Sequence, residues 1–430
     1  MNITFNTKNK IGIGVSGGVD SMVLLELMRR ADANIIVINI DHGIRGIESE
    51  MDSNFVIDYC KKHNIPYIHR KIQTLTYSKS EKTSIELSAR ILRYNVFDEL
   101  LATNTVDVIA LAHHSDDQIE TLLLRIFRGA SVRGMRGIVD RVGYIHPLLN
   151  YSKNDILDFA KTHNLVYVND NSNNNLDYSR NYVRNALIPI IAERFPSYKN
   201  SLLRITTTMQ EVNDFITSQL IPFKMKNNAY SLPTSLFEAH PVIAKNSIAE
   251  LLRNMHCENN ITATHYNSIL NLKNSINNSI LVLPNDLIVV KEYANLVFYK
   301  ASDYKFNHNY SELFSLNKDY ITEYFFLTTK PVTKIDVDTF DSDKIPSNSI
   351  IRTLKRGDSF TKFGGGTKSL SDYYTDIKLP HLRRKNQPVI AVNNIIYAIP
   401  GIAISEHLRI DNSTKYIYKF VFKEFPDATL

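Results

Sequence analysis

Cysteine is scarce in this chain of 430 residues, with only Cys60 and Cys257, which lie far apart in the sequence. A disulfide framework needs several paired cysteines, and a zinc or iron-sulfur site needs closely spaced ones, commonly as C-x-x-C. The sequence offers neither arrangement, so we expect no disulfide staples and no cysteine-held metal. Such a shortage is typical of proteins from a reducing compartment, and we expect a cytoplasmic location.

Long apolar runs are also missing. A membrane-spanning helix needs about eighteen or more consecutive apolar residues, and no such run occurs. The first ten residues, MNITFNTKNK, contain no apolar signal region. We therefore expect a soluble protein without a membrane partner. The composition, 43% hydrophobic and 22% charged, is that of an ordinary globular protein, and the length predicts two or three domains.

Short β-branched runs alternate with helical patterns over the first two hundred residues, which predicts a parallel sheet covered by helices. The expected strands are 11–15, 35–40, 66–70 and 106–112. The expected helices are 20–30, 49–63, 84–102 and 115–127. The predicted fold class is therefore α/β, with a doubly wound parallel sheet in an N-terminal domain and two smaller C-terminal domains.

The domain boundaries follow from breaks in these patterns. Pro196 interrupts the chain, a long helical stretch follows at 198–220, and a polar run occupies 301–312. Beyond that run, short strands are expected at 350–354, 389–392, 395–398 and 416–422. The predicted organisation is an α/β domain at 1–200, a linker helix at 201–222, a small helical or α+β domain at 223–300, a linker at 301–345 and a basic C-terminal domain at 346–430.

Polar chemistry is concentrated where the first strand runs into Ser16-Gly17-Gly18-Val19-Asp20-Ser21 and a helix follows. Glycines let backbone N–H groups point inward, and the helix N-terminus adds partial positive charge, so this loop suits phosphate oxygens. The lysine of the Walker loop is absent, so an ordinary NTPase loop is not indicated. Asp20 would repel phosphate unless a cation lay between them, and we expect Asp20 to hold Mg²⁺. The alternative is a tight strand-to-helix turn capped by serine.

This loop resembles the pyrophosphate loop of the N-type ATP pyrophosphatases, enzymes that cleave ATP between the α and β phosphates. Further motifs resemble, in order, those of the tRNA(Ile)-lysidine synthetases, and the match covers nearly all of the first 190 residues. These motifs are Asp41 to Arg45, Ala89 to Tyr94, Ala112 to Thr121, Leu124 to Gly129, His146 to Leu149, Asp170 to Asn173 and Arg180 to Arg184. The family more often has arginine at His146 and leucine at Ile44; these departures put local substrate contacts in doubt, not the reaction class.

The resemblance implies a two-step ligation. ATP adenylates the wobble cytidine of the tRNA(Ile) that carries a CAU anticodon, and L-lysine then displaces AMP to form lysidine. The codon read changes from AUG to AUA, and the amino acid from methionine to isoleucine. By the same resemblance, ATP contacts the Ser16 to Ser21 loop together with His42 and Arg90, and the catalytic residues are Asp20, Asp41, Asp117 and Glu120.

Three acids lie close together at the start of the expected helix 115–127. Glu120 follows Asp116 by four residues and Asp117 by three, spacings that place the carboxylates of each pair on one helix face. An ammonium substrate such as lysine needs an acidic receptor, and one acid could take up the proton that the attacking amine loses. Compensation of the helix dipole is the simpler alternative.

Positive charge gathers in two stretches of a chain whose net charge is +6. Residues 123–141 hold five arginines and one acid, and residues 351–385 hold nine Lys or Arg against three Asp. Such stretches are either solvated faces or contacts to RNA phosphates. The residues expected to contact tRNA are Arg125, Arg128, Arg133, Arg180, Arg184, Arg352, Arg356, Lys368, Arg383 and Arg384. By resemblance, the domain at 1–200 is catalytic, the domains at 223–300 and 346–430 bind tRNA, and the last domain holds the acceptor stem.

Three other functions compete with this interpretation. A tRNA-thiolating enzyme of the same superfamily needs cysteines to carry sulfur, and the chain has no C-x-x-C pair. A glutamine-dependent ligase needs an amidotransferase domain or partner. A non-catalytic RNA-binding module would be expected to have lost acids that serve only chemistry. The sequence leaves both a monomer and a homodimer open.

Overall fold

A computed structural model describes residues 1–44, 46–168, 179–226, 228–303 and 310–425. The chain divides into two compact units, Met1–Phe215 and Ile216–Leu430, and each is described by itself. Arg45 and the motif 170–173, both quoted above, lie outside the described residues. Within the described ranges, no helix combines the length and apolar character that a membrane crossing requires.

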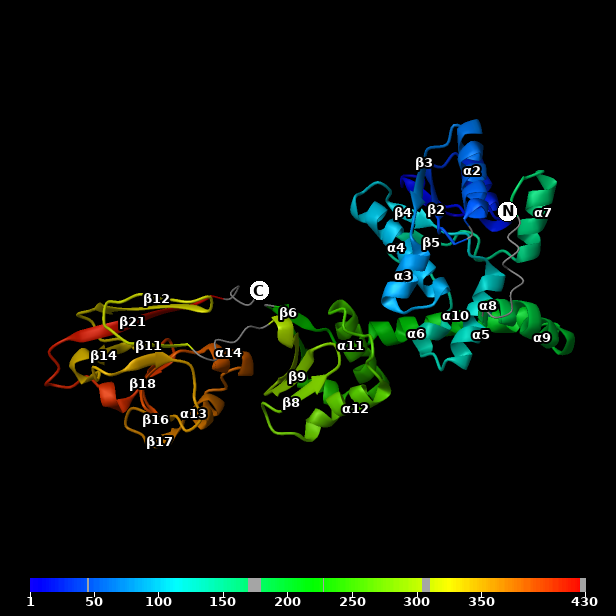
Figure 1. Ribbon diagram of the computed structural model, residues 1–430. Helices are drawn as coiled ribbons and strands as arrows, with labels where there is room; N and C mark the ends of the chain where they lie inside the picture. The colour runs from blue at the N-terminus through cyan, green and yellow to red at the C-terminus, as the bar shows by residue number, and fades with distance from the viewer. Residues whose placement is uncertain (45, 169–178, 227, 304–309, 426–430) are drawn as a thin grey trace. The chain divides into compact units, whose positions relative to one another are not determined.

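The first unit is built on a five-stranded parallel sheet with the order β3-β2-β1-β4-β5 (Figure 1). From β1, the chain adds β2 and β3 on one side and then β4 and β5 on the other, so the strand order reverses between β1 and β4. Open α/β sheets bind ligands at such a point, at the carboxyl ends of their strands. The predicted doubly wound sheet is confirmed. Its strands are β1 (Ile11–Gly14), β2 (Ile35–Asp41), β3 (Tyr67–Lys71), β4 (Val108–Ala110) and β5 (Tyr144–Ile145).

Helices cover both faces of this sheet because successive strand side chains point to opposite sides. Ile11, Ile13 and Val37 pack in one core with three helices, whereas Ile36 and Ile38 pack in another core with a fourth. The three helices of the first core are α1 (Val19–Arg30), α2 (Ile47–Lys62) and α7 (Lys153–Thr162). The helix of the second core is α4 (Ile85–Ala102).

The remaining helices of the first unit include α5, whose residues Ile119 and Leu123 pack against Val183 and the start of α10. A single π-helical turn, Val183–Leu187, follows α8. The long helix α10 crosses the division between the two units, and it begins before the predicted linker helix. The helices are α3 (Thr74–Glu81), α5 (Ser115–Phe127), α6 (Val132–Met135), α8 (Ser179–Tyr182), α9 (Ile188–Arg194) and α10 (Tyr198–Ser218).

The second unit begins with an antiparallel sheet of order β6-β7-β10-β9-β8, packed against two helices. Of the two alternatives expected for 223–300, helical or α+β, the structure has the α+β fold. Leu287 and Val289 on one strand and Leu296 and Phe298 on the next alternate inward, the pattern of a half-buried sheet. The elements are β6 (Lys224–Lys226), β7 (Ala229–Pro233), α11 (Pro241–Asn254), α12 (Ala263–Asn271), β8 (Ile280–Leu283), β9 (Leu287–Glu292) and β10 (Asn295–Lys300).

The rest of the second unit consists of two sheets, one of order β11-β15-β18-β19-β16-β17 with β20 on β19, the other of order β12-β13-β21-β14. Strands β11 to β14 lie where a linker was predicted at 301–345. Strand β11 pairs with β15, β12 pairs with its neighbour β13, and both β13 and β14 pair with β21, which comes much later in the chain. The strands are β11 (Ser311–Leu313), β12 (Tyr320–Ile321), β13 (Phe325–Pro331), β14 (Thr339–Asp341), β15 (Ile350–Arg352), β16 (Ser359–Thr361), β17 (Thr367–Ser369), β18 (Val389–Val392), β19 (Ile395–Ile399), β20 (Ala403–Ile404) and β21 (Ile417–Glu424). Two short helices, α13 (Leu370–Asp376) and α14 (His381–Asn386), accompany them.

Candidate active site

The loop between β1 and α1 is closed by its own hydrogen bonds. Gly17 has φ of +90°, a conformation that glycine adopts without strain, and its carbonyl oxygen accepts the N–H of Val168 at 2.9 Å. The Ser21 hydroxyl donates to the carbonyl oxygen of Gly18 at 2.9 Å and accepts the N–H of Ser16 at 3.2 Å. The loop is thus held in a fixed curve directly before the N-terminus of α1.

A cavity of about 620 Å³ lies over this loop at the carboxyl ends of β1, β2 and β4. Its size suits a small organic ligand. Most predicted ATP contacts line it, but Gly17 and Val19 do not, since the Gly17 carbonyl is turned to Val168 and Val19 is buried. The predicted residues that line it are Ser16, Gly18, Asp20, Ser21, Asp41, His42 and Asp117. We call this space the loop pocket.

Arg93 of α4 lines the loop pocket, where the sequence predicted Arg90. The two arginines lie three residues apart on the helix, and their guanidinium groups enter different cavities. Arg93 Nε and His42 Nδ1 are buried without a hydrogen-bond partner among the described residues, a situation that a bound ligand relieves. Burial lowers the pKa of His42 to about 4; the Arg93 charge adds to this effect and Asp41 opposes it.

Asp20 and Asp116 are both paired with cations of the chain itself. The Lys153 ammonium donates to Asp20 Oδ1 at 2.6 Å, and His114 Nε2 lies 3.8 Å from the same oxygen. Asp116 accepts the backbone N–H of Lys153 at 2.7 Å and pairs with the Lys199 ammonium. Burial raises the pKa of Asp116, but the bonds from Lys199 and Lys153 outweigh it and leave this pKa low. Asp116 is therefore already bonded to two lysines of the chain.

Asp117 and Glu120 form a compact ion cluster with Arg180 and Arg184. Arg180 donates to Asp117 at 2.8 Å and to Glu120 at 2.8 Å, and Arg184 donates to Glu120 at 2.5 Å. The Glu120 side chain is only 2% exposed. Burial raises the pKa of Asp117, but the charges of His114 and Arg180 outweigh burial and keep the carboxyl ionised. Two residues predicted to contact tRNA thus lie on two acids predicted to bind lysine.

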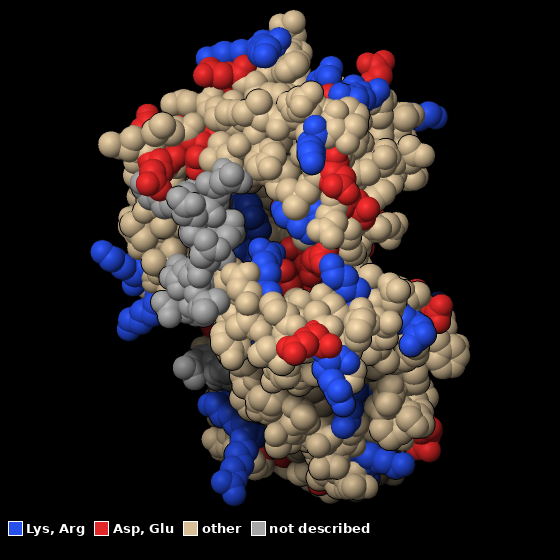
Figure 2. All heavy atoms as spheres, turned by 90° about the vertical axis from the view of Figure 1, so that its right-hand side faces the viewer, with Lys and Arg blue, Asp and Glu red and all other residues tan. Residues whose placement is uncertain are grey.

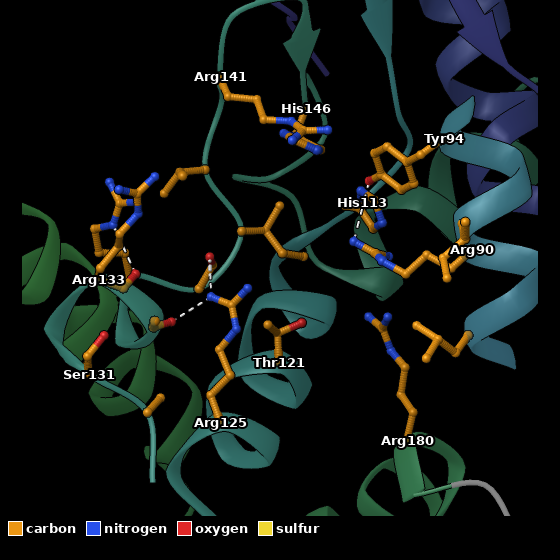
Figure 3. Close-up of a pocket in the computed structure, with 18 of the residues that line it drawn as sticks. Arg90, Tyr94, His113, Thr121, Arg125, Ser131, Arg133, Arg141, His146 and Arg180 are labelled. Carbon is orange, nitrogen blue, oxygen red and sulfur yellow. Dashed lines mark hydrogen bonds between the residues drawn. The ribbon is translucent and has the colours of Figure 1, made fainter. Parts of the chain in front are cut away.

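A second cavity, of about 1030 Å³, adjoins this cluster and is rich in arginine (Figure 3). Among the described residues that line it, Asp98 is the one acid, and its carboxylate accepts a hydrogen bond from the Tyr144 hydroxyl at 2.5 Å. Arg125 is tied to the carbonyl oxygens of Gly134 at 2.5 Å and Gly137 at 2.7 Å, so it shapes the wall of the cavity. The arginines that line it are Arg90, Arg125, Arg133, Arg136, Arg141 and Arg180. We call this space the arginine pocket; Arg128 lines neither pocket.

His113 and Arg180 line both pockets and so form part of the wall between them. The His113 ring lies 5.1 Å from the ring of His146, and its Nδ1 is buried without a hydrogen-bond partner among the described atoms. Burial lowers the pKa of His113 to about 3, with Asp117 opposing the effect, so the ring is neutral at physiological pH. His113 was quoted within a motif of the sequence but was not among the predicted site residues.

Comparison with known proteins places the chain in one family. Residues 2–191 match the model of the PP-loop domain, and residues 350–418 match that of the TilS substrate C-terminal domain. The chain is 32% identical to the tRNA(Ile)-lysidine synthase of Clostridium tetani (strain Massachusetts / E88), over 96% of this chain and 94% of the relative. It is 30% identical to the protein of the same name from Bacillus subtilis (strain 168), over 95% and 93%.

The chain belongs to the tRNA(Ile)-lysidine synthase family. The resemblance found in the sequence is thereby confirmed. A third member of the lysidine synthase family, from Clostridioides difficile (strain 630), is 28% identical over 97% of this chain and 96% of its own length. The competing thiolase, glutamine-dependent ligase and non-catalytic interpretations are set aside, because the match to lysidine synthases runs along almost the whole chain.

The basic C-terminal stretch of this lysidine synthase family member divides into buried and exposed residues. Arg352 is 1% exposed and binds Asp358 through two bonds of 2.7 and 2.8 Å, and Arg384 bonds to the carbonyl oxygens of Tyr374 and Leu379. Because these two guanidinium groups are enclosed and already bonded, we remove them from the expected tRNA contacts. Three predicted residues keep accessible side chains: Arg356, Lys368 and Arg383.

The Mg²⁺ expected from the sequence would have few protein ligands here. Within the described ranges, no group of three or more His, Cys, Asp or Glu side chains is arranged to hold a metal. Mg²⁺ commonly uses one or two carboxylates and takes its other ligands from substrate phosphates and water. Asp20, which lines the loop pocket beside the phosphate loop, fits that requirement. Figure 2 shows acidic and basic side chains side by side around a hollow of the molecule.

Proposed function

We propose that the loop pocket binds ATP and that the arginine pocket receives the wobble nucleotide of a tRNA. The chain is an ATP-dependent enzyme of tRNA modification that forms lysidine at the wobble position. The observation that carries the assignment of pockets is their shared wall, His113 and Arg180. A base held in one pocket can reach a phosphate held in the other only if the two cavities adjoin.

In the first step, the loop amides and the N-terminus of α1 bind the phosphates of ATP, and the released pyrophosphate stays in the loop. Donors fixed before the reaction stabilise the charge that develops on the leaving group. A Mg²⁺ ion held by Asp20 would add positive charge at the same place. His42 and Arg93 line this pocket, and each has a buried nitrogen without a partner among the described residues, which a bound nucleotide could satisfy. The cytosine carbonyl oxygen attacks the α-phosphate, which gives an adenylated cytidine.

The arginine pocket suits the nucleotide that undergoes this reaction. Its six arginines attract the phosphates on either side of the base, and guanidinium planes and Tyr94 offer surfaces for stacking. Neutral His113 can exchange hydrogen bonds with the base without adding a charge to the wall. Arg125, tied to two backbone carbonyl oxygens, positions residues 134–137 rather than the RNA itself.

In the second step, the ε-amine of L-lysine displaces AMP. The free amino acid carries both an ammonium and a carboxylate on its α-carbon, so its receptor needs both signs of charge. The cluster of Asp117, Glu120, Arg180 and Arg184 supplies two carboxylates and two guanidinium groups side by side. We assign this cluster to the α-amino and α-carboxylate groups of lysine, which leaves the ε-amine free to reach the adenylate.

The experiment is incubation of the full chain with radiolabelled lysine, ATP and bulk tRNA. Label should enter RNA only when ATP is present, and an Asp20→Ala variant should incorporate none. The tRNA must not already carry lysidine at the wobble position. Failure of the label to enter such tRNA would contradict the assignment. Light scattering on the same preparation measures whether the chain is a monomer or a homodimer. The contacts of Arg356, Lys368 and Arg383 with tRNA stay a prediction.

A further inference from the structure

The phosphate loop has no lysine of its own, yet a lysine ammonium from another element lies against it. Lys153 is the first residue of α7, and its Nζ donates to Asp20 Oδ1 at 2.6 Å. Asp20 stands in the first turn of α1, where it lines the loop pocket. Lys153 and Asp20 are 133 residues apart in the sequence. A local sequence pattern therefore could not have predicted this contact.

The position of Lys153 is fixed from both sides. Its backbone N–H donates to Asp116 at 2.7 Å, which joins the start of α7 to the start of α5. Ser152 caps α7 by a reciprocal pair of bonds with Asp155, and Ile156 packs in the same core as α1. The main chain of Lys153 is therefore anchored while its side chain, 37% exposed, extends along solvent to Asp20. An anchored backbone with a long, mobile ammonium is an arrangement suited to following a ligand charge.

We propose that Lys153 supplies, from α7, the phosphate-binding lysine that the loop itself lacks. Before ATP arrives, its ammonium neutralises Asp20, which would otherwise repel phosphate. When pyrophosphate occupies the loop, the ammonium keeps a bond to Asp20 and donates a further bond to a pyrophosphate oxygen. An ammonium group has three donors, and Asp20 uses one of them in the structure. Lys153 thereby stabilises the leaving group of the adenylation step.

The alternative for Lys153 is a purely structural ion pair between two helices. Such a pair, with both side chains about one-third exposed, contributes little to stability. A structural role would also be served by the backbone bond to Asp116, which every substitution at this position keeps. The two roles therefore differ in what they predict for pyrophosphate binding, and this inference rests on the proposed adenylation in the loop pocket.

The test measures binding of pyrophosphate with Mg²⁺ to the full chain by calorimetry, with no tRNA present. Lys153→Met keeps the length of the side chain and removes its charge, and Lys153→Arg keeps the charge. We expect Met to weaken binding by about 10- to 100-fold, the size of a lost charge-assisted hydrogen bond, and Arg to stay within about threefold of the parent. Lys161→Met, an exposed lysine in the last turn of the same helix, is the matched control and should leave binding unchanged.

A second measurement separates this idea from the function on which it rests. Single-turnover release of pyrophosphate at saturating ATP should fall about 100-fold in Lys153→Met and be largely restored in Lys153→Arg. Unchanged pyrophosphate affinity in Lys153→Met would overturn the proposal even if the parent protein incorporates lysine into tRNA. If Lys153→Met loses its fold by circular dichroism, Lys153→Gln takes its place, and equal binding by Gln and the parent would likewise overturn it. Failure of the parent to incorporate lysine would instead refute the proposed function.

Discussion

Replacement of Arg352 by methionine tests whether the basic C-terminal stretch is one RNA-binding surface or a mixture of structural and exposed charges. The Arg352 and Asp358 side chains are 1% and 0% exposed, and Arg352 also donates to the carbonyl oxygens of Thr353 and Asn393. Removing one partner of such a pair leaves a buried charge without compensation, which costs about 3–5 kcal/mol. For a unit of this size, each kcal/mol lowers the melting temperature by about 2–4 °C. We therefore expect the second unit to melt about 6–20 °C lower.

The matched control is Arg356→Met, only four residues away in the exposed turn that follows β15. It should leave the melting temperature within about 1 °C, because exposed surface substitutions change stability little. If Arg356 contacts a tRNA phosphate, its loss should reduce the salt dependence of tRNA binding by a slope of roughly 0.7 to 0.9. Differential scanning calorimetry gives the melting temperatures, and filter binding at several salt concentrations gives the slopes.

The double variant Arg352→Met, Asp358→Leu adds a stricter test. Replacing both partners of a buried ion pair with apolar side chains of similar size is often neutral, so much of the stability should return. The reasoning would be refuted if Arg352→Met melted like the parent while its tRNA binding lost salt dependence. That result would mean that the guanidinium group faces RNA and not Asp358.

Other expectations concern the first unit. Asp20→Ala should abolish pyrophosphate release and leave the melting transition almost unchanged, with a stability loss near roughly 1 kcal/mol at most; retained release would argue against a role at the phosphates. Gly17→Ala should weaken ATP binding, because φ of +90° strains any residue with a Cβ, and equilibrium dialysis with ATP would measure it. The pKa values of His42 and His113 are about 4 and about 3 in the folded chain, below the ordinary 6.5. At a pH between these folded-state values and 6.5, the unfolded chain therefore binds more protons than the folded chain. Stability should therefore fall as pH drops from about 6.5 toward 4, and urea unfolding should show a flatter pH dependence in His113→Gln; an unchanged dependence would contradict the buried neutral ring.

Local patterns were sufficient for the parts of the fold whose partners are close in sequence. The phosphate loop was found because strand, glycines and helix follow one another directly, and the strands 389–392 and 416–422 were found from β-branched and aromatic runs. Strands β11 to β14 were missed: β11, β12 and β14 have only two or three residues, and β11, β13 and β14 pair with strands farther along the chain. Pairing between distant segments leaves no periodic signal in either segment alone.

The same limit applies at the site. Asp117 and Glu120 were predicted as catalytic residues and Arg180 and Arg184 as RNA contacts, and the sequence did not show that these residues pair, because about sixty residues separate them. Arg90 was preferred to Arg93 because a helical pattern does not tell which of two neighbouring positions faces a cavity. Charge alone could not show that Arg352 is buried, since its partner Asp358 looks like any other acid in a basic run.

The account rests on cleavage of ATP between the α and β phosphates in the loop pocket, coupled to transfer of lysine to tRNA. The most direct test follows all products of one reaction that contains ATP labelled at the α-phosphate, labelled lysine and tRNA(Ile) with a CAU anticodon. We predict one AMP and one pyrophosphate for each lysine fixed to the tRNA, and none when the wobble cytidine is replaced by uridine. Formation of ADP and phosphate as the stoichiometric products, or AMP release without lysine fixed to RNA, would contradict the account.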